Sequence, residues 1–177
     1  MAEPKEPPPV KLIVAILFRL PGVNDTARDA MAQVFGDIDY TSERFDFDAT
    51  DYYAEEMGSP LYRLFYGFHR LMDPGSLSTI KLTTNQFEQQ MAADGKRIVN
   101  LDPGYLDTDK FVLASSKANA QKIYLAHGIW ADPTLRYEKG QFHPYPWSFP
   151  DFRSDRYQPC FMRLRDLYKK QRRLSLP

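Results

Sequence analysis

Apolar positions along this chain switch between two spacings, one typical of strands and one typical of helices. Residues 10–18 are apolar except for Lys11, which predicts a central strand covered on both faces. Between Asn24 and Gly36 the apolar residues recur on one helical stripe, and glycine is common just beyond a helix end. The chain is therefore expected to begin with a buried strand followed by an amphipathic helix.

Strand spacing then returns. Residues 38–47 hold two short apolar alternations of opposite parity, which indicates a bulge or kink between two short strands. Residues 62–68 alternate as a third strand, and Asp73-Pro74 marks the start of a second helix. A fourth strand is expected at residues 98–101. The resulting order, βαββαβ, is the split pattern of a ferredoxin-like sandwich.

The last third of the chain adds strands and a final helix. Lys139-Gly140 suits a hairpin turn, and Ser154 is a good N-cap for the last helix. Short strands are expected at residues 111–114, 122–125, 129–131, 135–137 and 142–145. We predict an α+β fold, in which a ferredoxin-like βαββαβ core is extended by additional antiparallel strands and a C-terminal helix.

The composition is that of one folded domain. With 177 residues and 43% hydrophobic residues, the chain can bury a substantial core. Residues 1–9 are acidic and proline-rich, so we expect a frayed tail there and a single α+β domain over residues 10–177. No apolar stretch reaches the roughly 18 residues of a membrane span. The acidic N-terminus is no secretory signal, and the single Cys160 excludes an internal disulfide, which together predict a cytoplasmic protein.

Charge is balanced overall but unevenly distributed. The formal net charge is +0, yet residues 23–57 carry ten acids against two arginines. Residues 153–173 carry eight basic residues against two acids. The total basic charge is too low for a nucleic-acid patch, so nucleic acid is not an expected partner. Lys169 and Lys170 complement the dipole of the last helix and leave open a scaffold role against an acidic protein.

The segment Asp102-Pro103-Gly104 carries the most informative local signal. Proline presets φ at the second position of a turn, and glycine accepts the positive φ that a type II turn requires at the third. We therefore expect a turn at this point. Asn100, Asp102 and Tyr105 would stand together at a strand end, where ligand-binding side chains are often found.

A polar row on the second predicted helix points toward this turn. Lys81, Asn85 and Glu88 are spaced four and three residues apart, so they share one helix face. A lysine beside an asparagine can hold a phosphate or carboxylate through a point charge and an amide donor. The alternative is that Lys81 and Glu88 are ordinary surface residues. We predict a site for a small anionic ligand, such as a nucleotide, built from Lys81, Asn85, Asn100, Asp102, Tyr105 and Lys117.

The acidic segment at residues 46–53 is a candidate metal site. It fails as a calcium-binding EF-hand loop because its sixth position is Asp51 and its twelfth is Met57. Asp48, Asp51 and Asp102 would bind a divalent cation such as Mg²⁺ if the two segments meet. A solvated strand edge, whose charges discourage aggregation, is the alternative interpretation.

The common catalytic and nucleotide-binding motifs are absent from the sequence. Neither the P-loop Gly-x-x-x-x-Gly-Lys-Ser/Thr nor Gly-x-Gly-x-x-Gly occurs. His69, His127 and His143 lie on separate segments, and one cysteine cannot complete a thiolate zinc site. No Ser-His-Asp arrangement can be identified.

Several motifs in a fixed order resemble one known family. They are Asp51-Tyr52-Tyr53, Lys81 with Thr84-Asn85, Asn100-Leu101-Asp102-Pro103-Gly104-Tyr105, Ile123-Tyr124-Leu125 with Gly128-Ile129, and Pro146-Trp147-Ser148-Phe149-Pro150-Asp151. The chain resembles, from about residue 11 to residue 172, the prokaryotic family catalogued as domain of unknown function 4416. The resemblance implies a stand-alone single domain, and some members carry a GTP-binding label.

Three functions remain open at this point. The first is a binding or regulatory protein for a small anionic ligand. The second is a metal-assisted hydrolase or transferase acting on a phosphorylated substrate, with Asp48, Asp51 and Asp102 as metal ligands and Lys81 as charge stabiliser. The third is a non-catalytic protein-interaction scaffold. The sequence does not decide whether the protein is an enzyme.

Overall fold

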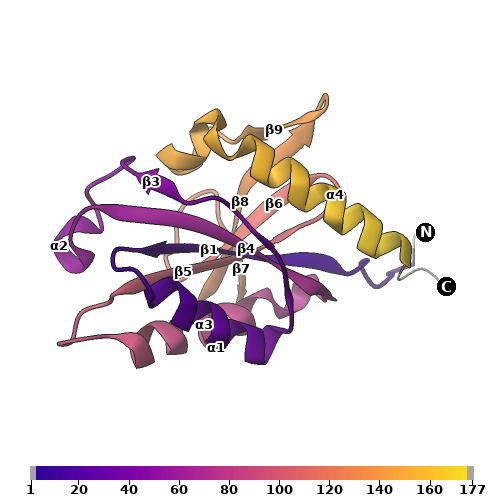
Figure 1. The fold of residues 1–177 in the computed structure, drawn as a ribbon. Coiled ribbons are helices and arrows are strands. Elements are labelled where there is room, and N and C mark those ends of the chain that lie inside the picture. Colours follow the sequence, from indigo (N-terminus) through magenta and orange to yellow (C-terminus); the bar gives the residue numbers. More distant parts are fainter. Residues whose placement is uncertain (1–2, 175–177) are drawn as a thin grey trace.

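The computed structural model describes residues 3–174 as one sheet with helices on both faces (Figure 1). The main elements are β1 (Val10–Phe18), α1 (Val23–Phe35), β2 (Ile38–Thr41), β3 (Phe45–Phe47), α2 (Ala54–Met57), β4 (Leu61–Met72), α3 (Leu77–Met91), β5 (Val99–Leu106), β6 (Lys110–Ser115), β7 (Ile123–Ala126), β8 (Ile129–Glu138), β9 (Gln141–Pro144) and α4 (Gln158–Leu174). Short 3₁₀ turns precede α3 and α4, at Pro74–Ser76, Pro150–Arg153 and Asp155–Tyr157.

The strands form a single antiparallel sheet. Within residues 3–174 it has nine strands, in the order β2-β4-β1-β5-β6-β8-β7, with β3 paired to β4 and β9 paired to β8. Every pairing between neighbouring strands is antiparallel. The prediction of a mixed α and β protein with a large antiparallel sheet and a C-terminal helix is confirmed.

The two faces of the sheet are covered by different helices, as Figure 1 shows. Along β1, Leu12 and Val14 pack in a cluster with α1 and α3, whereas Ile13 and Ala15 pack in a cluster with α4. Alternate side chains of a strand point to opposite faces, so a strand buried on both sides needs apolar residues at every position. This explains the continuous apolar run of residues 10–18.

Lys11, the charged residue inside that run, is fully buried but well bonded. Its Nζ donates to both carboxylate oxygens of Asp39 at 2.8 Å, to the backbone oxygen of Phe68 at 2.8 Å and to Oε1 of Gln171 at 3.0 Å. Burial lowers the pKa of the Lys11 ammonium, and its bonds to Asp39 oppose this shift. The contacts tie the end of α4 to β1, β2 and β4.

The segment Asp102-Pro103-Gly104 is not a turn, and that prediction was wrong. It lies inside β5, where Gly104 pairs with Ile13 of β1, and Gly104 does not have a positive φ. Instead, glycine is required by close approach, because an added Cβ would lie 2.5 Å from the backbone oxygen of Val112 and 2.8 Å from the ring of Phe111.

Strands β5 and β6 separate just beyond Gly104. They pair only over three residue pairs, from Gly104 with Leu113 to Leu106 with Phe111. Residues 99–103 of β5 pair with β1 alone, and residues 114–115 of β6 pair with β8 alone. We call the resulting gap the β5–β6 fork. The backbone N–H of Leu101 faces the fork, where it donates to Glu88. Backbone groups two residues apart in a strand point to the same side, so the nitrogen of Pro103 also faces the fork. Its missing N–H therefore removes no bond to β1.

Strand β8 is longer than the sequence predicted. The two strands expected at residues 129–131 and 135–137 are one continuous strand that passes through Pro133. The pairing with β6 is irregular at this point, between Phe111 and Val112. An irregular position accommodates the missing N–H of proline, so the residue does not end the strand.

The structure describes part of the predicted N-terminal tail and allows a search for membrane-spanning helices. Residues 3–9 of the predicted tail form no helix or strand and are exposed. Residues 1–2 of the tail and residues 175–177 of the predicted domain lie outside the described residues. Among residues 3–174 no helix has the length and apolar character that a bilayer crossing requires.

Candidate functional site

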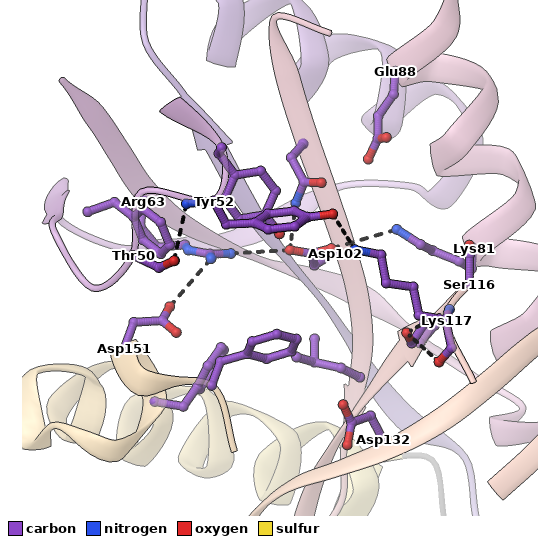
Figure 2. A pocket seen from close by; sticks show the side chains of 18 of the residues that line it. Thr50, Tyr52, Arg63, Lys81, Glu88, Asp102, Ser116, Lys117, Asp132 and Asp151 are labelled. Atoms are coloured by element: carbon purple, nitrogen blue, oxygen red, sulfur yellow. Dashed lines mark hydrogen bonds and ion pairs between the residues drawn. The ribbon is translucent and has the colours of Figure 1, made fainter. Parts of the chain in front are cut away.

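A cavity of about 390 Å³ opens at the β5–β6 fork. Its lining comes from β4, β5, β6, β8 and α3, from the segment before α2, and from the 3₁₀ turn at Pro150–Arg153. The volume is within the range of small-molecule sites. Figure 2 shows that the labelled polar side chains of this lining point in from several sides.

The fork lets α3 reach the open edge of β5. Nζ of Lys81 donates to the backbone oxygen of Leu101 at 2.8 Å, and Oε1 of Glu88 accepts from the backbone N–H of the same residue at 2.6 Å. These two side chains replace the bonds that β6 would otherwise supply. Burial raises the pKa of Glu88, while Lys81 and the Leu101 N–H oppose this.

Arg63 of β4 lies at the inner end of the cavity between two carboxylates. Its Nη1 is 3.4 Å from Oδ2 of Asp102 and its Nη2 is 3.4 Å from Oδ2 of Asp151, as Figure 2 shows. The guanidinium carbon lies 5.0 Å from the ring centroid of Phe47. Within residues 3–174 the buried Nε of Arg63 has no hydrogen-bond partner. The guanidinium is thus enclosed but far from fully hydrogen-bonded.

A chain of polar contacts holds Asp102 in place. Nδ2 of Asn100 donates to Oδ2 of Asp102 at 2.6 Å, and Oδ1 of Asn100 accepts from Nη1 of Arg97 at 2.8 Å. Arg97 in turn donates to Glu56 of α2 at 2.6 Å. Nζ of Lys81 lies 3.7 Å from Oδ1 of Asp102. The carboxylate therefore has a fixed orientation and two cationic neighbours.

The opposite side of the cavity holds a second buried ion pair. Nζ of Lys122 lies 3.5 Å from Oδ2 of Asp132 and donates to Oγ of Ser115 at 2.8 Å. Burial raises the pKa of Asp132, and contacts with Lys122 and Gln121 oppose this. Within the described chain, Oδ1 of Asp132 has no hydrogen-bond partner.

The outer part of the lining is more exposed. Nζ of Lys117 donates to the hydroxyl of Tyr52 and lies 4.3 Å from the centroid of its ring. Nδ2 of Asn85 is 3.4 Å from Oγ of Ser116, so α3 also contacts the end of β6. Lys117 and Tyr52 are exposed, unlike the buried Arg63.

A family match covers most of the chain. The model of the family described as Domain of unknown function (DUF4416) matches residues 8–168. The chain belongs to this family. The match confirms the family resemblance expected from the sequence motifs, whereas the GTP-binding label of some members stays a prediction. No curated protein and no solved structure matches the chain.

In this DUF4416 member most of the predicted anion-binding residues lie together. The side chains found in the lining of one cavity are Lys81, Asn85, Asn100, Asp102 and Lys117. Tyr105 is absent from that lining and packs instead with the cluster around Leu77 and Val112. The reason is strand alternation, since Asn100 and Asp102 point to the α4 face and Tyr105 points to the other.

The three carboxylates predicted as a metal site do not come together. Asp102 lines the cavity, but Asp48 and Asp51 do not. Oδ1 of Asp48 instead accepts from Arg156 at 2.9 Å, and this contact lowers the pKa of Asp48. Among residues 3–174 no three histidine, cysteine or acidic side chains form a group that could hold a metal ion.

Several lining residues were not expected from the sequence. Arg63, Asp151, Lys122 and Asp132 come from four separate segments, so no local spacing links them. One signal was available for Arg63. It shares its strand face with Phe65 in a strand that is apolar on both faces, which indicates a buried charge.

Proposed function

We propose that the cavity binds a small anionic ligand, and that cationic side chains at the β5–β6 fork hold its phosphate or carboxylate group. The observation that carries this proposal is the unused hydrogen-bonding capacity of two buried cations at the fork. Within residues 3–174, Arg63 and Lys81 each donate one side-chain hydrogen bond. Nη2 of Arg63 and Nζ of Lys81 also lie 3.4 Å and 3.7 Å from carboxylate oxygens of Asp151 and Asp102. A guanidinium has five N–H donors and an ammonium has three.

Unused N–H groups on buried cations are costly, and within residues 3–174 the buried Nε of Arg63 has no hydrogen-bond partner. The side chains of Arg63 and Lys81 are 5% and 8% exposed. Leaving a charged donor unsatisfied in such surroundings costs about 1–3 kcal/mol or more. An oxyanion satisfies several such donors at once and forms bonds about twice as strong as neutral ones.

Net charge supports the same proposal only weakly. The described lining contains the cations Arg63, Lys81, Arg97, Lys117 and Lys122 and the acids Glu88, Asp102, Asp132 and Asp151. Because cations exceed acids by only one, attraction at long range is small. Recognition depends on the direction of the free N–H groups, and this favours a compact oxyanion over a diffuse polyanion.

The test is calorimetric titration at low salt with inorganic phosphate, pyrophosphate and nucleoside 5′-mono-, di- and triphosphates. We expect binding of at least one phosphate compound. We expect Lys117→Gln to weaken it about fivefold, the loss of one exposed charged contact. Lys81→Met should weaken it further, because it removes a buried donor.

Lys170→Gln is the matched control, since it removes the same charge from an exposed position on α4. Its affinity should equal that of the wild type. The proposal fails if no phosphate compound gives heat or a thermal shift. It also fails if Lys81→Met and Lys117→Gln leave the affinity unchanged while both variants remain folded.

We also propose that β1, α1, β2, β4, α3 and β5 form a ferredoxin-like unit. Support comes from the order β2-β4-β1-β5, in which each pair of strands joined by α1 or α3 encloses one strand of the other pair. Such interleaved crossovers are the arrangement expected of the split βαβ pattern. An experimental structure whose core superimposes on ferredoxin-like domains would test it.

A further inference from the structure

One feature of the cavity is not explained by anion binding, namely the free oxygen of Asp132. The residue is 5% exposed, and within residues 3–174 its Oδ1 has no hydrogen-bond partner. An ionised phosphate or carboxylate group has no hydrogen-bond donor, so the anionic group of a ligand cannot satisfy this oxygen. Buried oxygens without partners are rare in native proteins and usually mark a missing partner.

The surroundings of Asp132 determine whether this oxygen accepts or donates a hydrogen bond. Nζ of Lys122 lies 3.5 Å from the other oxygen, Oδ2, and donates to Ser115 at 2.8 Å. Burial raises the pKa of Asp132, while contacts with Lys122 and Gln121 oppose this shift. In its ionised form the carboxylate only accepts hydrogen bonds. The partner of Oδ1 in the ionised carboxylate is therefore a hydroxyl or N–H donor.

Asp132 and Arg63 lie on opposite sides of the cavity. Asp132 is paired with Leu113 of β6, and Leu113 is paired with Gly104 of β5, the strand that carries Asp102. Two strand spacings place the backbones of β5 and β8 about 10 Å apart. Figure 2 likewise shows Asp132 facing the cavity from the side opposite Asp151 and Arg63.

We infer that the ligand is an organic phosphate with a hydrogen-bond donor at its distal end, bound by Arg63 and Lys81 at the phosphate and by Asp132 at the donor. This inference rests on the proposed function, because it assigns the second end of the same ligand. Inorganic phosphate fills only one side of the cavity. A phosphate monoester that carries a distal hydroxyl or amino group spans both sides and brings a donor to the Asp132 side.

The first test uses the wild-type protein and three five-carbon ligands. Pentyl phosphate has no distal donor, ribose 5-phosphate offers hydroxyl donors, and 5-aminopentyl phosphate offers an ammonium. We expect ribose 5-phosphate or 5-aminopentyl phosphate to bind about tenfold tighter than pentyl phosphate, the gain from satisfying a buried acceptor. The comparison between the two donors identifies the donor type. Equal or tighter binding of pentyl phosphate than of both donor ligands overturns the inference.

The second test is Asp132→Asn, which replaces the hydrogen-bond acceptor at the Oδ1 position with a donor. The amide oxygen of asparagine will face Lys122, so its NH₂ group will occupy the position of Oδ1 and present a donor. We expect the preference for the donor ligand over pentyl phosphate to fall about tenfold, while the affinity for inorganic phosphate stays within about twofold. Asp166→Asn, on the exposed side of α4, should change neither value.

The outcomes separate this inference from the proposed function. If the wild type binds no phosphate compound, the proposed function fails and the inference fails with it. If inorganic phosphate binds but no donor ligand gains affinity, only the inference fails. If Asp132→Asn weakens all ligands equally, Asp132 is a structural residue and the inference is overturned. If this variant does not fold, the wild-type ligand comparison decides alone.

Discussion

Nζ of Lys81 donates to the backbone oxygen of Leu101 across 2.8 Å, and this bond joins a helix to a strand edge that has lost its neighbouring strand. The contact exists only because β5 and β6 separate beyond Gly104. Helix α3 covers one face of the sheet, yet its polar side chains reach a cavity whose other walls are on the α4 face. The fork is thus the structural basis of the proposed site.

Gly104→Ala tests whether close packing at the fork requires glycine. The added Cβ would lie 2.5 Å from a backbone oxygen and 2.8 Å from the Phe111 ring, so strands β5 and β6 must move apart. We expect a loss of about 1–3 kcal/mol or more in the free energy of unfolding, measured with urea. Gly95→Ala is a control in open space that carries only a positive φ, with an expected cost of about 1 kcal/mol. Equal costs for both variants would contradict the packing argument.

Arg63→Met should be strongly destabilising, because it leaves Asp102 and Asp151 without their shared cation. Breaking a buried ion pair by removing one partner costs about 3–5 kcal/mol. The double variant Arg63→Met with Asp151→Asn should be more stable than Arg63→Met alone, since one unpaired charge is removed. Urea unfolding of both proteins measures the difference. If the double variant is less stable than Arg63→Met, the loss of the ion pairs with Arg63 does not explain the destabilisation by Arg63→Met.

Glu88→Gln should change how stability depends on pH. Burial raises the pKa of Glu88 above its ordinary 4.5, so the folded state binds a proton more tightly than the unfolded state. The contribution of Glu88 to stability is then greatest at low pH and falls as pH rises from about 4.5 through the raised pKa. Glutamine still accepts from the Leu101 N–H but does not titrate. Urea unfolding between pH 4.5 and 7.5 should show wild-type stability declining relative to the variant, and a constant difference would refute the shift.

Lys11→Met tests the buried contact between α4 and the sheet. The variant leaves the Asp39 carboxylate and the Phe68 carbonyl without the ammonium that both now bind. We expect a loss of about 3–5 kcal/mol in unfolding free energy. Arg28→Met, at an exposed ion pair with Asp25, should cost at most about 1 kcal/mol. Similar effects of the two variants would mean that the Lys11 network does not stabilise α4.

The spacing of apolar residues predicted where helices and strands occur better than where strands end. The strand at residues 10–18 and the helix ended by Gly36 follow directly from apolar spacing, and both are confirmed. A turn was predicted at Pro103, and two separate strands were predicted at residues 129–131 and 135–137, yet Pro103 and Pro133 both lie inside strands. Proline is tolerated there because its missing N–H faces the fork or an irregular position, and this depends on pairing partners far away in the sequence.

The site was predictable only where its residues share one element. Lys81 and Asn85 lie on one helix face, and Asn100 and Asp102 lie on one strand face, so spacing alone links each pair. Asp132 approaches across β6, which only the strand order reveals. Tyr105 was misplaced because a turn was assumed where the strand continues.

An experimental structure of the protein with ribose 5-phosphate or 5-aminopentyl phosphate, whichever binds tighter, would show directly where the ligand lies. We expect the phosphate group in the cavity at the β5–β6 fork, with its oxygens about 3 Å from nitrogens of Arg63 and Lys81. The distal hydroxyl or amino group should point toward Asp132. An empty fork, or a phosphate bound only at the basic end of α4, would contradict the account.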